Sequence, residues 1–72
     1  MKKIPVMVIN EINRLSEKYR SLHDLYSADV EWLINGTQWL NGDDLKLANW
    51  FNANTVLFEK EFLNRISNQK PN

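Results

Sequence analysis

The chain has 72 residues, nine basic and nine acidic side chains, and no cysteine. These numbers exclude a disulfide-stapled fold and a broadly basic nucleic-acid or lipid-surface binder, which would need a surplus of Lys and Arg. No apolar run approaches the roughly 18 residues of a membrane span. A chain this short buries only about 60% of its unfolded surface, so a partner surface would add useful burial to a thin core.

The composition indicates one folded domain. Ten asparagines point to an AT-rich genome, such as that of a bacterium or a phage, and three tryptophans are too many for a disordered chain. The apolar run at residues 4–9 is too short for a secretion signal and leads directly into charged Glu11. We therefore expect a single small helical domain over residues 1–72, cytoplasmic, with a disordered tail from about residue 68.

The first third of the chain carries a helical stripe, because its apolar positions alternate steps of four and three. Pro5 suits a first helical turn, where its missing N–H removes no hydrogen bond. The spacing predicts a helix over about residues 5–26 that packs inside the fold or in a small dimer, since it is too short for a free-standing coiled coil. The stripe consists of Val8, Ile12, Leu15, Tyr19, Leu22 and Tyr26.

The middle segment, residues 28–40, allows two structures. Ser27 followed by early carboxylates is typical of a helix start, and it predicts a short helix over about 28–34 that stops at Asn35-Gly36. The alternative is a β-hairpin at residues 30–40, because Asn-Gly favours a tight turn. We prefer one or two helical pieces, since a lone two-stranded hairpin is marginally stable in water.

The last part of the chain predicts a helix over residues 43–67 that begins with a cap and an acidic first turn. Trp50, Ala53 and Leu57 lie opposite its expected core face. A helix apolar on both faces must be covered on both or must break, and residues 52–55 offer a break near residue 53. The core face consists of Leu47, Ala48, Phe51, Thr55, Phe58, Phe62 and Ile66. The fold class is therefore an all-α compact bundle of three to four helices, with an α+β fold containing the hairpin as the alternative.

The charges are segregated along the chain. Residues 1–20 hold five basic and two acidic side chains, residues 21–45 hold five acidic and no basic ones, and residues 46–72 hold four basic and two acidic. An acidic segment that also carries tryptophans fits a basic partner, because charge steers encounter and aromatic side chains supply affinity. Acidic first turns of helices would produce the same segregation.

Exposed tryptophan and leucine on one helical face would form an interface, because tryptophan often anchors binding surfaces. The competing interpretation is that the same residues are core. The candidate protein-binding residues are Trp50, Leu57, Ala53, Trp32, Trp39, Asp43 and Asp44.

No catalytic, cofactor or metal site is predicted. His23 is the only histidine, and a nominal triad of His23, Asp24 and a nearby serine lacks an elbow glycine and an oxyanion arrangement. The pair Glu59 and Glu61 points to different helix faces, and two glycines cannot form a phosphate loop.

We expect a non-enzymatic adaptor, inhibitor or regulator of bacterial or phage origin that docks on another protein or, as a homodimer, on its own copy. It would use the Trp-containing face and the acidic segment. The alternative is a small helix-turn-helix-like transcriptional regulator reading DNA with its last helix, although the acidic segment makes nucleic acid a poor partner. That helix would present Asn52, Asn54, Lys60, Asn64 and Arg65.

Overall fold

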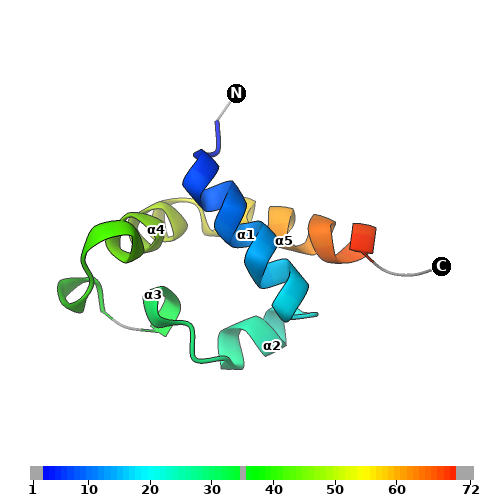
Figure 1. Ribbon diagram of the computed structural model, residues 1–72, viewed down its shortest axis with the longest axis horizontal. Helices are drawn as coiled ribbons and strands as arrows, with labels where there is room; N and C mark the ends of the chain where they lie inside the picture. The colour runs from blue at the N-terminus through cyan, green and yellow to red at the C-terminus, as the bar shows by residue number, and fades with distance from the viewer. Residues whose placement is uncertain (1–2, 35, 70–72) are drawn as a thin grey trace.

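The computed structural model describes residues 3–34 and 36–69 of the chain, which form five α-helices and one 3-10 turn (Figure 1). No strand occurs in these two ranges. The all-α prediction is confirmed, and the hairpin alternative at 30–40 is wrong; the predicted stop at Asn35 lies outside the described residues. In chain order the elements are α1 (Val6–Lys18), α2 (Leu22–Ser27), α3 (Glu31–Ile34), η1 (Thr37–Trp39), α4 (Gly42–Ala53) and α5 (Thr55–Gln69).

The single helix expected over 5–26 is wrong, because the chain breaks between α1 and α2. Tyr19 and Ser21 both have extended backbone angles. The Ser21 hydroxyl oxygen accepts a 3.0 Å hydrogen bond from the backbone N–H of Asp24, which satisfies one of the free amides at the start of α2. The cap at Ser21 therefore starts a new helix, although the apolar spacing continues across the break.

The break changes which side chains enter the core. Leu25 is fully buried, whereas Tyr26, which the uninterrupted stripe placed inside, is 41% exposed. Ser27, expected to open a helix, instead closes α2, and α3 begins at Glu31. The first half of the stripe is as predicted, because Val8, Ile12 and Leu15 are buried.

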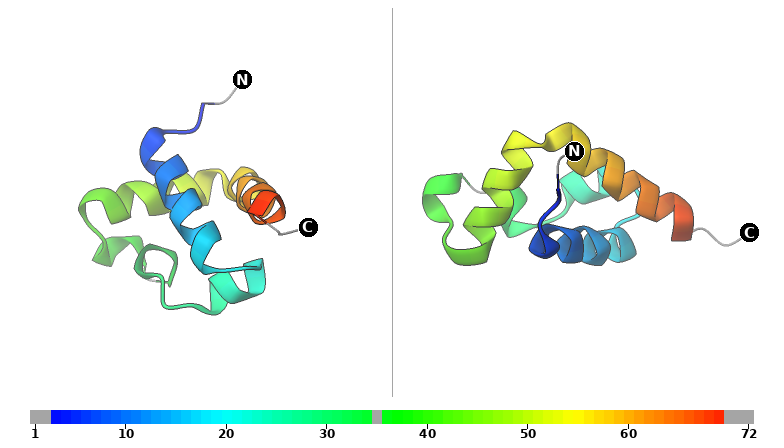
Figure 2. Two further views of the ribbon diagram at one scale, coloured as in Figure 1. Left: turned by 45° about the vertical axis from the view of Figure 1, so that its right-hand side comes forward. Right: turned by 90° about the horizontal axis from the view of Figure 1, so that it is seen from above.

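Of the two possibilities for the last helical region, the structure has the break, which lies at Asn54, where α4 and α5 meet at an angle (Figure 2). The Asn54 side-chain amide donates a 2.9 Å hydrogen bond to the Trp50 carbonyl, and the Thr55 hydroxyl donates a 2.8 Å bond to the Phe51 carbonyl. Both bonds satisfy carbonyls that lose their helical partners at the end of α4.

The core lies where α1 packs against α5 and α3 against α4. Its centre is aromatic: the rings of Trp32, Phe51 and Phe58 meet edge to face, with centroids 4.9–5.8 Å apart. The predicted core face of the last helical region is buried at most of its positions. The buried apolar side chains are Val8, Ile12, Leu15, Leu25, Val30, Trp32, Leu40, Leu47, Ala48, Phe58, Phe62 and Ile66.

The described chain is helical up to its C-terminal end. α5 runs to Gln69, so it includes residue 68, where we expected the tail to begin; the rest of that tail, residues 70–72, lies outside the described residues. Among the described helices, none has the length and apolar character needed to cross a bilayer.

Candidate protein-binding groove

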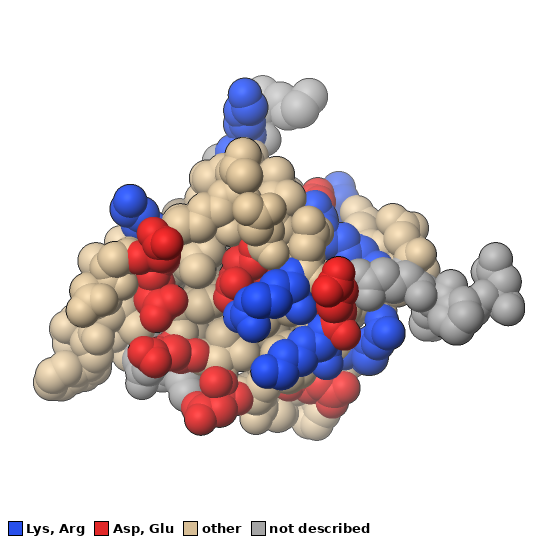
Figure 3. Space-filling model, viewed as in Figure 1, with Lys and Arg blue, Asp and Glu red and all other residues tan. Residues whose placement is uncertain are grey.

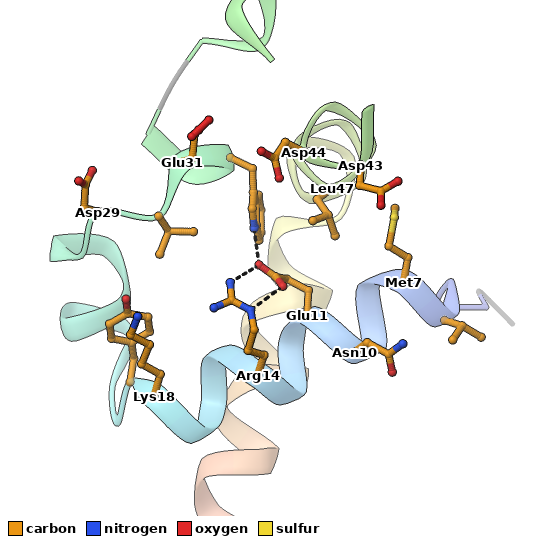
Figure 4. Close-up of a pocket in the computed structure, with 14 residues that line it drawn as sticks. Met7, Asn10, Glu11, Arg14, Lys18, Asp29, Glu31, Asp43, Asp44 and Leu47 are labelled. Carbon is orange, nitrogen blue, oxygen red and sulfur yellow. Dashed lines mark hydrogen bonds and ion pairs between the residues drawn. The ribbon is translucent and has the colours of Figure 1, made fainter. Parts of the chain in front are cut away.

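An open groove of about 740 Å³ lies between α1 on one side and residues 29–32 and 43–47 on the other. We call it the acidic groove. One wall is α1, and the other is formed by the α2–α3 connection, α3 and the first two turns of α4 (Figure 4). Its walls are distant in sequence, so it exists only because α3 packs on α4 while α1 packs on α5. The lining residues are Val6, Met7, Asn10, Glu11, Arg14, Lys18, Tyr19, Asp29, Val30, Glu31, Trp32, Asp43, Asp44 and Leu47.

The carboxylate of Glu11 organises the α1 wall. Arg14 donates to it through two nitrogens, Nε at 2.9 Å and Nη2 at 2.6 Å, in a two-pronged ion pair. The indole N–H of Trp32, on α3 at the base of the groove, donates a third bond of 2.8 Å. The hydrogen bond from Arg14 is the main reason why the pKa of Glu11 lies below its ordinary value, so this carboxylate is held ionised.

The groove has an apolar base. Val30, Trp32 and Leu47 are each at least nine-tenths buried and line it, and half-buried Met7 lies beside them. Val6, at the start of α1, lines the same groove but is 71% exposed. A ligand that covered Val6 and Met7 would therefore bury apolar surface that now meets water.

The wall opposite α1 carries four carboxylates: Asp29, Glu31, Asp43 and Asp44. Within the described part of the chain, none of the four takes part in an ion pair or a side-chain hydrogen bond. In the space-filling view several acidic side chains gather on the α3 and α4 side, where one basic side chain borders them, while the side chains over α1 are both basic and acidic (Figure 3).

Across the groove, Arg14 is neutralised by Glu11, which leaves Lys18 as the facing cation. One cation against four carboxylates gives the groove an excess of three negative charges. The acidic excess of residues 21–45 is thus retained in the lining of the groove.

The groove lining contains no Cys, His, Ser or Thr, and its titratable side chains are carboxylates, Arg14, Lys18 and Tyr19. The lowered pKa of Glu11 is opposite to what a general acid at neutral pH requires. His23 is exposed on α2, and the described residues hold no group of three His, Cys, Asp or Glu side chains that could bind a metal ion.

The seven residues predicted to bind a partner divide among four places. Trp32, Asp43 and Asp44 line the acidic groove, and Trp32 is also a core residue. Ala53 and Leu57 line a second hollow of about 460 Å³ at the α4–α5 junction, where Ala53 is exposed and Leu57 half-buried. Trp50 is half-buried against the core, and Trp39 is 76% exposed; neither lines either hollow.

The residues of the α1 wall were not among those predicted from the sequence to bind a partner. Glu11 and Arg14 are three residues apart, a spacing at which opposite charges pair on one helix face, and Lys18 follows one turn later. That spacing signals a charged ridge beside the apolar stripe. It does not show what the ridge faces, because the opposite wall comes from residues 29–47.

Among the residues of the DNA-reading alternative, Asn54 and Arg65 are hydrogen-bonded within the fold, whereas the others, Asn52, Lys60 and Asn64, are exposed. Arg65 donates from Nε to the Asn13 side-chain oxygen at 2.6 Å and from Nη1 to the Glu61 carboxylate at 2.8 Å. Lys60 is exposed on α5. Comparisons of the chain with protein-family models, with curated proteins and with solved structures found no match.

Proposed function

We propose that this protein is a non-enzymatic binding module, an adaptor, inhibitor or regulator, that takes a segment of another protein into the acidic groove. The observation that carries the proposal is the combination of an apolar base with four carboxylates that have no partner among the described residues. Protein interfaces commonly combine a desolvated apolar centre with a charged rim.

The groove supports binding better than the face centred on Trp50 and Leu57 does. Both of those side chains are half-buried, and Trp50 packs against the core, so much of their apolar surface is already used within the fold. The hollow beside Leu57 is smaller and includes one charged side chain, Lys60. The acidic groove is larger than the hollow beside Leu57 and carries more charged side chains, and both properties favour the groove as the binding site.

The proposal is tested with two exposed valines near the starts of their helices. Val6 is 71% exposed and lines the groove, and Val56 is 82% exposed and lines the second hollow. Immobilised wild-type protein, Val6→Gln and Val56→Gln are each incubated with host-cell extract, and the captured protein is quantified by mass spectrometry. We expect Val6→Gln to retain about tenfold less partner than wild type, since lost apolar contact weakens the complex, and Val56→Gln to retain as much as wild type.

A third variant, Ala53→Gln, tests the α4–α5 face directly, because Ala53 is exposed there. Loss of partner with Ala53→Gln but not with Val6→Gln would place binding on that face and contradict the groove. Failure of wild-type protein to retain any partner above a blank resin would contradict the function itself.

A further inference from the structure

The charge balance of the acidic groove identifies the chemistry of what binds there. We infer that its occupant is a cationic amphipathic segment of a partner protein, with Lys or Arg along one edge and apolar side chains along the inner face. This inference rests on the proposed function and adds the class of partner to it.

The acidic wall selects the cationic edge. Asp29 and Glu31 come from the α2–α3 connection and the start of α3, and Asp43 and Asp44 from the first turn of α4, so that the four follow one another along the wall (Figure 4). Carboxylates spread along the wall favour an extended set of cations over a single point charge. With Arg14 already paired to Glu11, the uncompensated charge is that of the acidic wall.

The base of the groove selects the apolar inner face. Trp32 is 5% exposed, and its N–H is already committed to Glu11 at 2.8 Å, so the indole has no free donor for a ligand. Val30, Leu47 and Met7 contribute only apolar atoms from their side chains. A polar group placed on this base would lose its hydrogen bonds to water without replacement, which disfavours a uniformly hydrophilic cationic segment.

A second copy of this chain fits the groove poorly. Two copies that met through it would bring together two surfaces with an excess of three negative charges each, and like charges across an interface oppose association. Lys18 is the groove's cation outside the Glu11–Arg14 pair, and it lies 5.6 Å from the centre of the Tyr19 ring on its own chain. We therefore assign the groove to another protein.

The test uses three synthetic peptides of one length with the intact protein. The first places Lys and Leu on opposite faces of a helix, the second has the same composition in scrambled order, and the third replaces Lys by Glu. Binding is measured by isothermal titration calorimetry at two salt concentrations. We expect the first peptide to bind with 1:1 stoichiometry, about tenfold or more tighter than the second, with an affinity that falls as salt rises, and the third not to bind.

Matched charge variants locate the site. The groove variant, Asp43→Asn/Asp44→Asn, removes two carboxylates of the groove. The control variant, Asp24→Asn/Glu17→Gln, removes two exposed carboxylates outside the groove. The two are matched because Asp24, like Asp43, lies in the first turn of its helix. The groove variant should bind the first peptide about tenfold more weakly and the control within about twofold of wild type. Asp29→Asn/Glu31→Gln provides a second groove variant if α4 is weakened, and circular dichroism checks the fold of each.

Three results would overturn the inference: equal binding of the ordered and scrambled peptides, equal weakening by the groove and control variants, or a wild-type dimer that Val6→Gln dissociates. If no peptide binds while host-cell partner capture still depends on Val6, the cationic assignment is wrong and the binding function remains. If capture also fails, both are wrong.

Discussion

The indole N–H of Trp32 donates a 2.8 Å hydrogen bond to Oε2 of Glu11, which lies 21 positions earlier in the chain. The same oxygen accepts a 2.6 Å bond from Arg14. One carboxylate therefore joins α1 to α3 and fixes one wall of the acidic groove against its base. Both the stability of the fold and the shape of the groove depend on it.

Replacing Glu11 by Ala should lower the free energy of unfolding by about 2 kcal/mol, because the buried Trp32 N–H would lose its acceptor. Urea denaturation of Glu11→Ala, Trp32→Phe and the double variant measures the coupling between the two side chains. We expect a coupling energy of about 1 kcal/mol. A value within about 0.3 kcal/mol of zero would show that the bond contributes nothing to stability.

The Glu11 carboxyl should also make stability depend on pH. Its folded-state pKa is lowered from 4.5, chiefly by the hydrogen bond from Arg14, so the unfolded chain binds a proton more readily than the folded one. Its contribution is complete well above pH 4.5 and is lost as pH falls through the folded-state pKa. Urea midpoints of wild type and Glu11→Gln should therefore converge between pH 7 and about pH 3. A constant difference over that range would contradict the shift.

Sequence periodicity identifies the core of the C-terminal half because burial there follows a helical repeat. Phe58, Phe62 and Ile66 are spaced four apart, and all three are buried in α5. The same reasoning fails at residues 19–21, since Tyr19 and Leu22 continue the repeat across a helix break. The local signal was Ser21 followed three residues later by Asp24, a capping pattern that competes with apolar spacing.

The cap at Ser21 gives a matched pair of serine variants. Ser21→Ala should cost about 1 kcal/mol of folding free energy, because the Asp24 N–H loses its acceptor. Ser27→Ala should be within about 0.5 kcal/mol of wild type, because Ser27 is exposed at the end of α2. Thermal and urea unfolding of both variants measures the difference. A larger loss of folding free energy with Ser27→Ala than with Ser21→Ala would indicate that a helix begins at Ser27.

The two glycines should respond differently to a methyl group. Gly42 has a φ of +57°, in the left-handed region, and Gly42→Ala should cost about 1 kcal/mol although no atom lies within 4 Å of the added carbon. Gly36 has a φ of −62°, and its added carbon would meet only the end of the flexible Gln38 side chain. Gly36→Ala should therefore be neutral or about 0.5 kcal/mol more stable by urea denaturation. Equal effects at both positions would contradict the backbone geometry at Gly42.

The carboxylates of the acidic wall could be predicted from the sequence, whereas the groove itself could not. The uninterrupted run of acidic charge over residues 21–45 contains all four wall carboxylates, including Asp43 and Asp44. From the sequence, Trp50 and Trp32 could each be a core or an interface residue. In the structure Trp32 belongs to both the core and the groove, because α3 directs its indole toward Glu11. Such assignments depend on how helices pack, and a single helical repeat carries no information about the neighbour it faces.

Binding in the acidic groove is tested most directly by the tryptophan side chains themselves. Trp32 lines the groove, while Trp39 is 76% exposed outside both hollows and serves as an internal control. Adding the cationic amphipathic peptide to ¹⁵N-labelled protein should shift the indole N–H resonance of Trp32 in proportion to saturation and leave that of Trp39 unchanged. Unchanged Trp32 with a saturable shift of Trp39 would contradict binding in the groove.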